Sequence, residues 1–347
     1  MTKTVLVCEA QVPFVHGGAE LHVRGLVKEL TRRGYRAEKV SVPFKWYPKT
    51  ELLAQAAAWR LIDLSESNGE RIDTVIATKF PTYFVRHPRK VTWLFHQYRA
   101  IYDLFDTPYS EFTHSEADVR VRDRLIGLDT EVLGESARLF ANARNTAARL
   151  ARYNGLTAEP LYHPPPLAAN ITPGPFGDYV LSVGRLEGNK RVELIVRAMA
   201  HADRRTRLIV AGEGPLRAQL EAAAADAGCA DRVTFAGAVP EAELIALYAG
   251  ALAVVFPPFD EDYGYVTLEA FLARKPVITT TDAGGPLEFV EDGVNGLIAD
   301  ATPEALGAAI ARLAADPRTA QSFGAAGYER ARTITWDGVV DRLMADG

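Results

Sequence analysis

This chain of 347 residues has only two cysteines, no long apolar run and no excess of positive charge. Cys8 and Cys229 lie far apart and form no CxxC pair, so neither a disulfide framework nor a zinc site is indicated. The net charge of −5 argues against a general nucleic-acid binder, which needs a broad cationic surface. No apolar run approaches the length of a membrane span, and residues 1–10 lack the pattern of a signal peptide. We therefore expect a cytoplasmic protein without a nucleic-acid partner.

The residues that are present alternate between short apolar runs and helical periodicity. Hydrophobic residues make up 48% of the chain, and its length exceeds what one core usually serves. The alternation predicts an α/β fold in which helices cover both faces of parallel sheets. The predicted strands of the first half are 4–7, 37–42, 74–77, 91–95 and 138–141. Those of the second half are 179–183, 208–211, 233–236, 253–256 and 277–279.

A cluster of five prolines between residues 161 and 175 interrupts this alternation and predicts a linker. We therefore expect two Rossmann-like domains, 1–165 and 166–330. Such domains would face each other across a cleft at the carboxyl ends of their sheets, where open α/β folds bind ligands.

The clearest chemistry of the second domain follows the predicted strand 253–256. Glu261 and Glu269 lie eight residues apart, and Gly264 between them suits a tight turn before a helix. The first amides of that helix, around Gly264, Tyr265 and Val266, would point toward an anion such as a phosphate. The two carboxylates would accept hydrogen bonds from sugar or ribose hydroxyls.

Arg185 and Lys190 follow another predicted strand of the same domain. Because parallel strands end at one edge of a sheet, we expect these cations to converge with Glu261 and Glu269. A guanidinium and an ammonium can neutralise a leaving diphosphate. Surface ion pairs are the commoner explanation for any one charged residue, but the order of the four residues favours a common site.

The first domain offers weaker signals. Gly17 and Gly18 follow the first predicted strand, where a glycine loop lets a diphosphate or sugar approach the backbone, although the same pair could be only a turn. His96 follows the strand 91–95, where a lone histidine is more often structural. The aromatic segment after it, up to Phe112, is expected to shape an acceptor site. Between residues 21 and 50, eight Lys or Arg residues stand against Glu29 and Glu38, which suits either a solvated helix face or peripheral contact with anionic lipid.

Several motifs in the order found here resemble those of the retaining glycosyltransferases of family 4, which have the GT-B architecture. The resemblance covers most of the second domain and is carried by the segments VGRLEGNKRVELIVRAM, VAGEGPL, FAGAV, the EX7E motif of Glu261 and Glu269, and GGPLEFVEDGVNGL.

This resemblance implies a role for each candidate residue. Glu261 would meet the transferred sugar and Glu269 the nucleotide ribose. Arg185 and Lys190 would hold the diphosphate, and His96 would lie against the donor sugar. It also implies that residues 331–347 form a helix that crosses back to the first domain.

The implied activity is transfer of a hexose-type sugar, with retention, from a nucleoside diphosphate sugar. The acceptor would be a glycan, a lipid-linked molecule or a small molecule. No cofactor and no metal would be needed. The chain departs from the family pattern at Asp262, at His163 before Pro164, and at Arg191, which adds a further candidate for a phosphate contact.

Other classes remain open at this stage. Asp260 and Asp262 spell DxD, the manganese signature of a different glycosyltransferase architecture, although here it overlaps the EX7E motif. A nicotinamide dehydrogenase also has Rossmann-like domains, but no GxGxxG opens the first βα unit. A two-lobed sugar-binding protein without catalytic activity would also explain a cleft.

Overall fold

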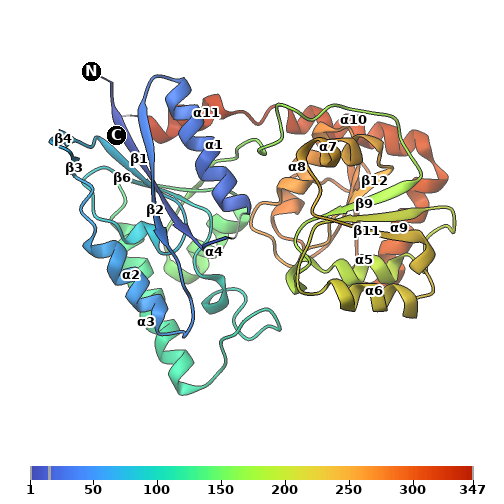
Figure 1. Ribbon diagram of the computed structural model, residues 1–347, viewed down its shortest axis with the longest axis horizontal. Coiled ribbons are helices and arrows are strands. Elements are labelled where there is room, and N and C mark those ends of the chain that lie inside the picture. Colours follow the sequence, from blue (N-terminus) through green and yellow to red (C-terminus); the bar gives the residue numbers. More distant parts are fainter. Residues whose placement is uncertain (1, 15–16, 346–347) are drawn as a thin grey trace. The chain divides into compact units, whose positions relative to one another are not determined.

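A computed structural model describes residues 2–14 and 17–345 of the chain. Contacts divide it into two compact units, the first of Met1–Pro166 with Thr335–Gly347 and the second of Leu167–Ile334. Each unit contains one six-stranded sheet whose neighbouring strands all run parallel (Figure 1). The predicted class, two α/β domains built on parallel sheets, is confirmed. The cleft between them stays a prediction.

The sheet of the first unit has the strand order β2-β1-β5-β6-β7-β8. Its strands are β1 (Thr4–Gln11), β2 (Arg36–Pro43), β5 (Thr74–Ala77), β6 (Lys90–Leu94), β7 (Arg138–Ala141) and β8 (Glu159–Pro160). Its helices are α1 (Gly18–Arg32), α2 (Glu51–Leu61), α3 (Glu116–Gly134), α4 (Arg144–Asn154) and α11 (Trp336–Met344). A separate antiparallel pair joins β3 (Glu66–Ser67) to β4 (Glu70–Arg71).

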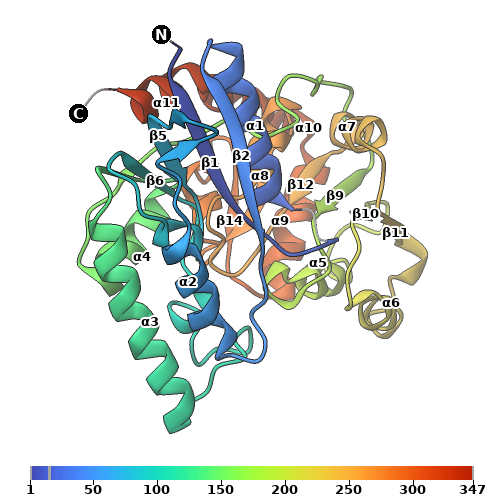
Figure 2. The same cartoon turned by 60° about the vertical axis from the view of Figure 1, so that its left-hand side comes forward.

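Two apolar cores lie on the two faces of this sheet. Successive side chains of a strand point to opposite faces, so Val5 and Val7 join the core under α1 and α11, whereas Cys8 joins the core under α2, α3 and α4. Figures 1 and 2 both show α2 and α3 side by side. The helical stripe predicted for α1 is present, since Val23, Leu26 and Leu30 are buried.

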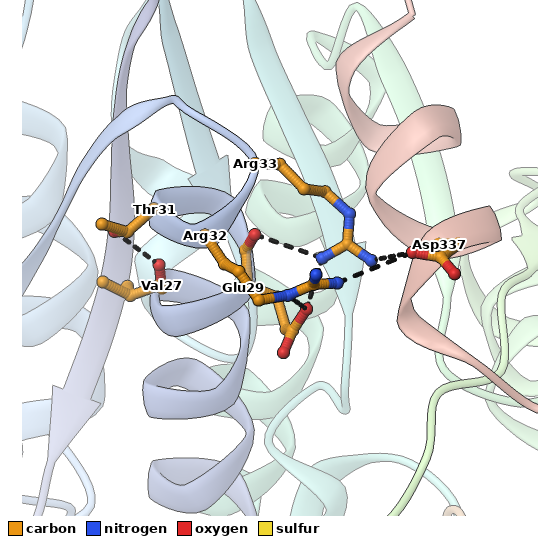
Figure 3. Close-up of polar contacts among 6 residues, drawn as sticks. All are labelled: Val27, Glu29, Thr31, Arg32, Arg33 and Asp337. Carbon is orange, nitrogen blue, oxygen red and sulfur yellow. Dashed lines mark hydrogen bonds and ion pairs between the residues drawn. The ribbon is translucent and has the colours of Figure 1, made fainter.

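Helix α11 brings the end of the chain into the first unit. Its residues Val339, Val340 and Leu343 are buried in the same core as α1. Figure 3 shows Arg33, directly after α1, paired with Asp337 of α11, and Arg32 paired with Glu29 at 3.0 Å. The amphipathic pattern of α11 is thus satisfied by α1 rather than by its sequence neighbour α10 (Pro317–Ala331).

The sheet of the second unit has the order β11-β10-β9-β12-β13-β14. Its strands are β9 (Tyr179–Val183), β10 (Arg207–Ala211), β11 (Val233–Gly237), β12 (Ala253–Val255), β13 (Val277–Thr280) and β14 (Gly296–Ala299). Its helices besides α10 are α5 (Val192–Ala198), α6 (Arg217–Asp226), α7 (Glu241–Gly250), α8 (Tyr265–Leu272) and α9 (Pro303–Ala315). Helices α5, α6 and α9 lie on one side of the sheet and α7 and α8 on the other (Figure 1).

The predicted linker contains no helix or strand between β8 and β9. The buried Lys275 donates hydrogen bonds of 3.0 Å to the carbonyl oxygens of Gly174 and Pro175, and its Nζ lies 3.8 Å from the centre of the Phe176 ring. Burial lowers the pKa of Lys275 to about 8. The proline-rich segment is therefore fixed to the second unit at its carboxyl end.

The ten predicted strands are present, but the short pair of β3 and β4 was not predicted, and β8 and β14 of the two large sheets were missed. β8 has only two residues, one of them proline, and β14 begins at a glycine, so neither shows a strand pattern by itself. Among the described residues, no helix is long and apolar enough to cross a membrane.

Candidate active site

Two loops of the second unit meet where β9 and β12 end. These strands are parallel neighbours, so the loops that follow them leave the same edge of the sheet. The first loop contains a 3-10 turn, Gly188–Lys190, and the second runs from residue 256 to 264. The amide of Phe259 donates to the carbonyl oxygen of Asn189 at 2.8 Å and ties the two loops together.

Lys190 and Glu261 form an ion pair at this meeting point. Their side chains are 16% and 18% exposed, and Lys190 Nζ lies 5.9 Å from the centre of the Phe256 ring. A cation suited to phosphate and a carboxylate suited to hydroxyls are thus brought together in one partly shielded position. In such a position electrostatic interactions are stronger than at an exposed surface.

The backbone of Glu261 is held on both sides by the loop that follows β13. Its amide donates to Ala283 O at 2.8 Å, and its carbonyl oxygen accepts from the Gly285 amide at 2.7 Å. A Cβ atom at Gly285 would lie 2.6 Å from Asp262 O, so any side chain there would displace the Glu261 loop. The Gly284-Gly285 pair therefore serves the placement of Glu261.

Arg191 is held by contacts within the protein, so the phosphate contact suggested by its place in the sequence stays a prediction. Its guanidinium donates to the carbonyl oxygens of Pro257 and Pro258, at 2.8 and 2.7 Å, and forms an ion pair with Asp282. Burial opposes ionisation of Asp282, but these hydrogen bonds outweigh it and lower the pKa of the carboxyl. Arg191 is a structural anchor that fixes the loop before Glu261.

Glu269 lies in the second turn of α8 and is only 7% exposed. Tyr248, a fully buried residue of α7, donates its hydroxyl to Glu269 Oε2 at 2.7 Å. Burial raises the pKa of Glu269 to about 7, although the bond from Tyr248 opposes that shift. A carboxyl group with this pKa exchanges a proton near neutral pH. No sequence pattern indicated Tyr248, which lies 21 residues away on another helix.

Gly264 begins helix α8 with a backbone conformation that other residues rarely adopt, φ +82°. A Cβ atom there would lie 3.1 Å from both Phe256 and Pro286. Tyr265 and Val266 form the first turn, whose amides carry the partial positive charge of a helix N-terminus. The helix starts four residues after Glu261, at the same edge of the sheet.

Arg185 is not brought into the Lys190–Glu261 pair. Its side chain is 56% exposed and pairs with Glu187 at 2.7 Å. It leaves the sheet in the same loop after β9, one residue beyond Gly184. The flexible stem of an arginine could swing this guanidinium toward a ligand at that edge.

In the first unit, a carboxylate of helix α1 itself caps the N-terminus of that helix at the glycine loop. The amide of Gly17 donates to Glu20 Oε2 at 2.9 Å, and Lys79 Nζ donates to Glu20 Oε1 at 2.9 Å. Gly18 is the first residue of α1. A carboxylate therefore occupies the place where an anionic ligand would meet this helix N-terminus, which weakens the expected role of Gly17 and Gly18 in binding a diphosphate.

His96 follows β6 and is partly exposed. Its Nδ1 contacts Gln97 O at 2.7 Å, and because a carbonyl oxygen can only accept, Nδ1 carries the proton. The His96 carbonyl oxygen accepts from the Phe80 amide at 3.2 Å and links the loops after β5 and β6.

The histidine that departs from the family pattern at the linker, His163, has a structural role. Its Nε2 lies 3.0 Å from Nδ1 of His22, and both side chains are buried. The rings of Trp93, Phe95 and Trp336 surround the pair. Burial lowers the pKa of His163 to about 3 and that of His22 well below its usual value. Both imidazoles are therefore neutral at pH 7.

Within residues 2–14 and 17–345, no group of three or more His, Cys, Asp or Glu side chains is arranged to hold a metal ion. Asp260 has a left-handed backbone, with φ 42°, and its amide donates to Asp282 O at 2.9 Å. The DxD sequence is thus part of the loop that the end of β13 fixes.

Comparisons with known proteins agree with this geometry. Residues 176–330 match the family model of the glycosyl transferases group 1. The matched residues include Lys190, Glu261 and Glu269. This part of the chain therefore belongs to that family. The chain is 31% identical over 256 residues to a D-inositol 3-phosphate glycosyltransferase of Segniliparus rotundus, a match that covers 67% of this chain and 57% of the relative. The chain thus spans little more than half the length of that relative.

Solved structures show the same fold over nearly the whole chain. Sucrose-phosphate synthase from Thermosynechococcus elongatus superimposes with a TM-score of 0.76, at 19% identity, over 98% of this chain and 97% of that one. Anabaena HepE, solved in complex with UDP and glucose, superimposes with a TM-score of 0.72, at 17% identity, over all of both chains. The structural neighbours are GT-B glycosyltransferases, as the sequence predicted.

Proposed function

We propose that this chain is a retaining, metal-independent glycosyltransferase. It would move a hexose-type sugar from a nucleoside diphosphate sugar to a hydroxyl group of a glycan, a lipid-linked molecule or a small molecule. The observation that carries the proposal is the Lys190–Glu261 pair, which lies on the loops after β9 and β12, with Glu261 four residues before the start of α8.

The proposed roles follow from the chemistry of each group. Lys190, Arg185 and the first amides of α8 would hold the diphosphate, because fixed cations and helix-end amides stabilise the charge that develops on it. Glu261 would accept hydrogen bonds from hydroxyls of the transferred sugar. Glu269, kept close to its protonation midpoint by burial, would bind the ribose hydroxyls.

The reaction needs no enzymic nucleophile in this scheme. The bond between the sugar carbon and the phosphate oxygen breaks while the acceptor oxygen forms its bond on the same face of the sugar. The acceptor proton passes to an oxygen of the departing diphosphate. The protein then contributes charge stabilisation and positioning, which together supply several kcal/mol. His96, which follows β6, would lie against the donor sugar, as the resemblance to the family implies.

The printed names of related proteins guide the choice of donor and acceptor to test. HepE was solved with UDP, which makes UDP-sugars the first donors to examine. The name of the Segniliparus relative includes D-inositol 3-phosphate, so phosphorylated polyols belong in an acceptor panel beside neutral glycans.

The direct experiment combines binding and turnover on the wild-type chain. A donor that binds the folded state raises its melting temperature, so thermal shift with UDP-, GDP-, ADP- and TDP-sugars identifies the base. Slow hydrolysis of that donor, followed by nucleoside diphosphate release, then separates an enzyme from a sugar-binding protein. A donor that is bound but neither hydrolysed nor transferred to any acceptor would contradict the proposal.

Peripheral membrane contact is a weaker part of the proposal. At least five of the eight cations between residues 21 and 50 already have acidic partners, namely Arg32, Arg33, Arg36, Lys39 and Lys49. Figure 3 shows two of them on α1. This internal pairing favours a solvated helix face. Co-sedimentation that rises with the anionic lipid content of vesicles would support membrane contact, and equal sedimentation with neutral vesicles would remove it.

A further inference from the structure

The first unit contains a surface cavity that none of the proposed roles uses. It has a volume of about 530 Å³ and lies between the segment after β2 and the beginning of α3. The segment after β2 supplies Trp46, Tyr47 and Lys49, whereas Glu111, Asp118 and Val121 come from α3 and the loop before it. This volume is within the range of cavities that bind small molecules.

One wall of this cavity is aromatic. The rings of Trp46 and Tyr47 meet edge to face, with centroids 5.2 Å apart, and Tyr47 is 60% exposed. Pro48 continues the same wall. Exposed rings of this size are large apolar surfaces with a polar edge, and they suit ligands that present both C–H and O–H groups.

The lining of the cavity also includes a buried carboxylate. Asp118 is 7% exposed, and its Oδ2 accepts from Lys49 Nζ at 2.7 Å and from the Thr113 amide and hydroxyl at 2.8 Å. These bonds, that from Lys49 first, lower the pKa of Asp118 to about 2. Its other oxygen, Oδ1, accepts no hydrogen bond from the residues that the structure describes. A ligand hydroxyl could donate to it.

The charges of the lining disfavour an anion. Two carboxylates, Glu111 and Asp118, stand against one ammonium, Lys49, which already forms an ion pair. These carboxylates would repel a phosphate or carboxylate ligand. A long acyl chain would bury the ion pair without offering it any hydrogen bond. An uncharged ring with several hydroxyls satisfies both the aromatic wall and the carboxylate.

Aromatic packing joins this cavity to the loop that carries His96. Phe44 stacks on Trp46 with centroids 6.3 Å apart and meets Tyr98 at 6.4 Å. Tyr98 follows His96 by two residues, and its hydroxyl donates to Glu111 of the cavity. The cavity is therefore built on the same loops as the predicted reaction side of the first unit.

We propose that this cavity binds an uncharged pyranose ring of the acceptor, as a subsite separate from the hydroxyl that reacts. This inference rests on the proposed transferase function. It makes the acceptor a saccharide or glycoside that extends beyond one ring, and it assigns Trp46, Tyr47 and Asp118 to acceptor recognition.

The test measures saccharide binding without any nucleotide, by saturation-transfer difference NMR and by tryptophan fluorescence. The probes are maltose, lactose and gentiobiose as uncharged disaccharides, with glucose 6-phosphate as the anionic comparison. Trp46→Ala and Tyr47→Ala remove the aromatic wall. Leu61→Ala removes an apolar side chain that is 86% exposed and does not line the cavity, so it is the matched control.

The wild-type chain is expected to bind at least one disaccharide, and more tightly than glucose 6-phosphate. Each aromatic variant should bind about tenfold more weakly, whereas Leu61→Ala should bind like the wild type. If Trp46→Ala melts early, Tyr47→Ala decides the result, because an exposed ring contributes little to folding. The inference is overturned if no disaccharide binds the wild type, if both aromatic variants bind normally, or if glucose 6-phosphate binds best. Donor hydrolysis is measured separately, so failure of either proposal is visible without the other.

Discussion

The two units place a Lys–Glu pair at the same point of two different sheets. Counting strands along each unit, the order is 3-2-1-4-5-6 in the second unit and 2-1-3-4-5-6 in the first. Ligands of such sheets bind where the order reverses, which is between β9 and β12 in the second unit and between β1 and β5 in the first. Lys190 and Glu261 lie at this point in the second unit, and Lys79 and Glu20 lie at this point in the first unit.

The pairs differ in what their carboxylates do. Glu20 caps its own helix through the Gly17 amide, whereas Glu261 comes from a loop that the end of β13 holds in place. The cap leaves the first unit without an open anion site at α1, and the second unit keeps the start of α8 beside its pair. The difference teaches that a shared fold fixes where a site lies, while the loops decide which ligand it binds.

The strongest challenge to this comparison is Lys190→Ala. Turnover of the donor should fall roughly a hundredfold, because a fixed cation that stabilises the leaving diphosphate is lost. Arg185→Ala should act in the same direction. Arg205→Ala is the matched control, since Arg205 lies in the same unit and its side chain is 91% exposed. Unchanged turnover in both Lys190→Ala and Arg185→Ala would refute the assignment of the second unit as the donor site.

Glu269→Gln tests the buried carboxyl of the second unit. The pKa of an unfolded glutamate is near 4.5, whereas burial raises that of folded Glu269 to about 7, so wild-type stability falls as pH rises between these values. Glutamine removes this loss and should raise the free energy of unfolding at pH 8 by up to about 3 kcal/mol.

The same substitution should raise KM for the donor about tenfold, because a charged acceptor for the ribose becomes a neutral one. Urea unfolding at pH 5 and pH 8, with donor kinetics, checks both effects. A variant that gains no stability at pH 8 would show that burial does not raise the pKa of Glu269.

His163→Asn tests the imidazole pair of the first unit, where the sign is opposite. The folded pKa values of His22 and His163 lie below 6.5, so the unfolded chain binds protons first and stability falls as pH drops below about 6.5.

Removing one of the two histidines should make that fall less steep by about 1 kcal/mol per pH unit. Unfolding is compared between pH 7 and pH 5, as the difference between variant and wild type. This difference cancels Asp129, a buried carboxyl whose pKa burial raises to about 7. Equal slopes in the two proteins would show that the pair is accessible to protons in the folded state.

The smallest expected effect is that of EDTA. If Lys190 and Arg185 supply the positive charge, donor turnover should change less than about twofold after chelation. Loss of activity with EDTA and its recovery with manganese would instead bring Asp260 and Asp262 into the mechanism. A calcium-binding enzyme treated in parallel confirms that chelation was complete.

The sequence pattern predicted the central strands of both sheets, because a parallel strand that is buried on both faces is a continuous apolar run. It also placed Lys190 and Glu261 on loops at one edge, since parallel strands leave little choice. It could not predict Tyr248 beside Glu269, the anchoring role of Arg191, or His22 against His163. Each of these contacts joins residues that are far apart in the chain, and the partner depends on how helices pack rather than on local pattern.

The residue pattern alone predicted the two-sheet α/β class, the order of the motifs and a division near the proline-rich segment. These properties follow from local propensity, apolar period and turn residues. Long-range packing determines which charged side chains are paired with one another. Glu261 pairs with Lys190, Glu20 caps α1, and Arg191 holds a loop. The physical reason is that a charge acquires its role from burial and partners, which long-range packing sets and no short segment of sequence records.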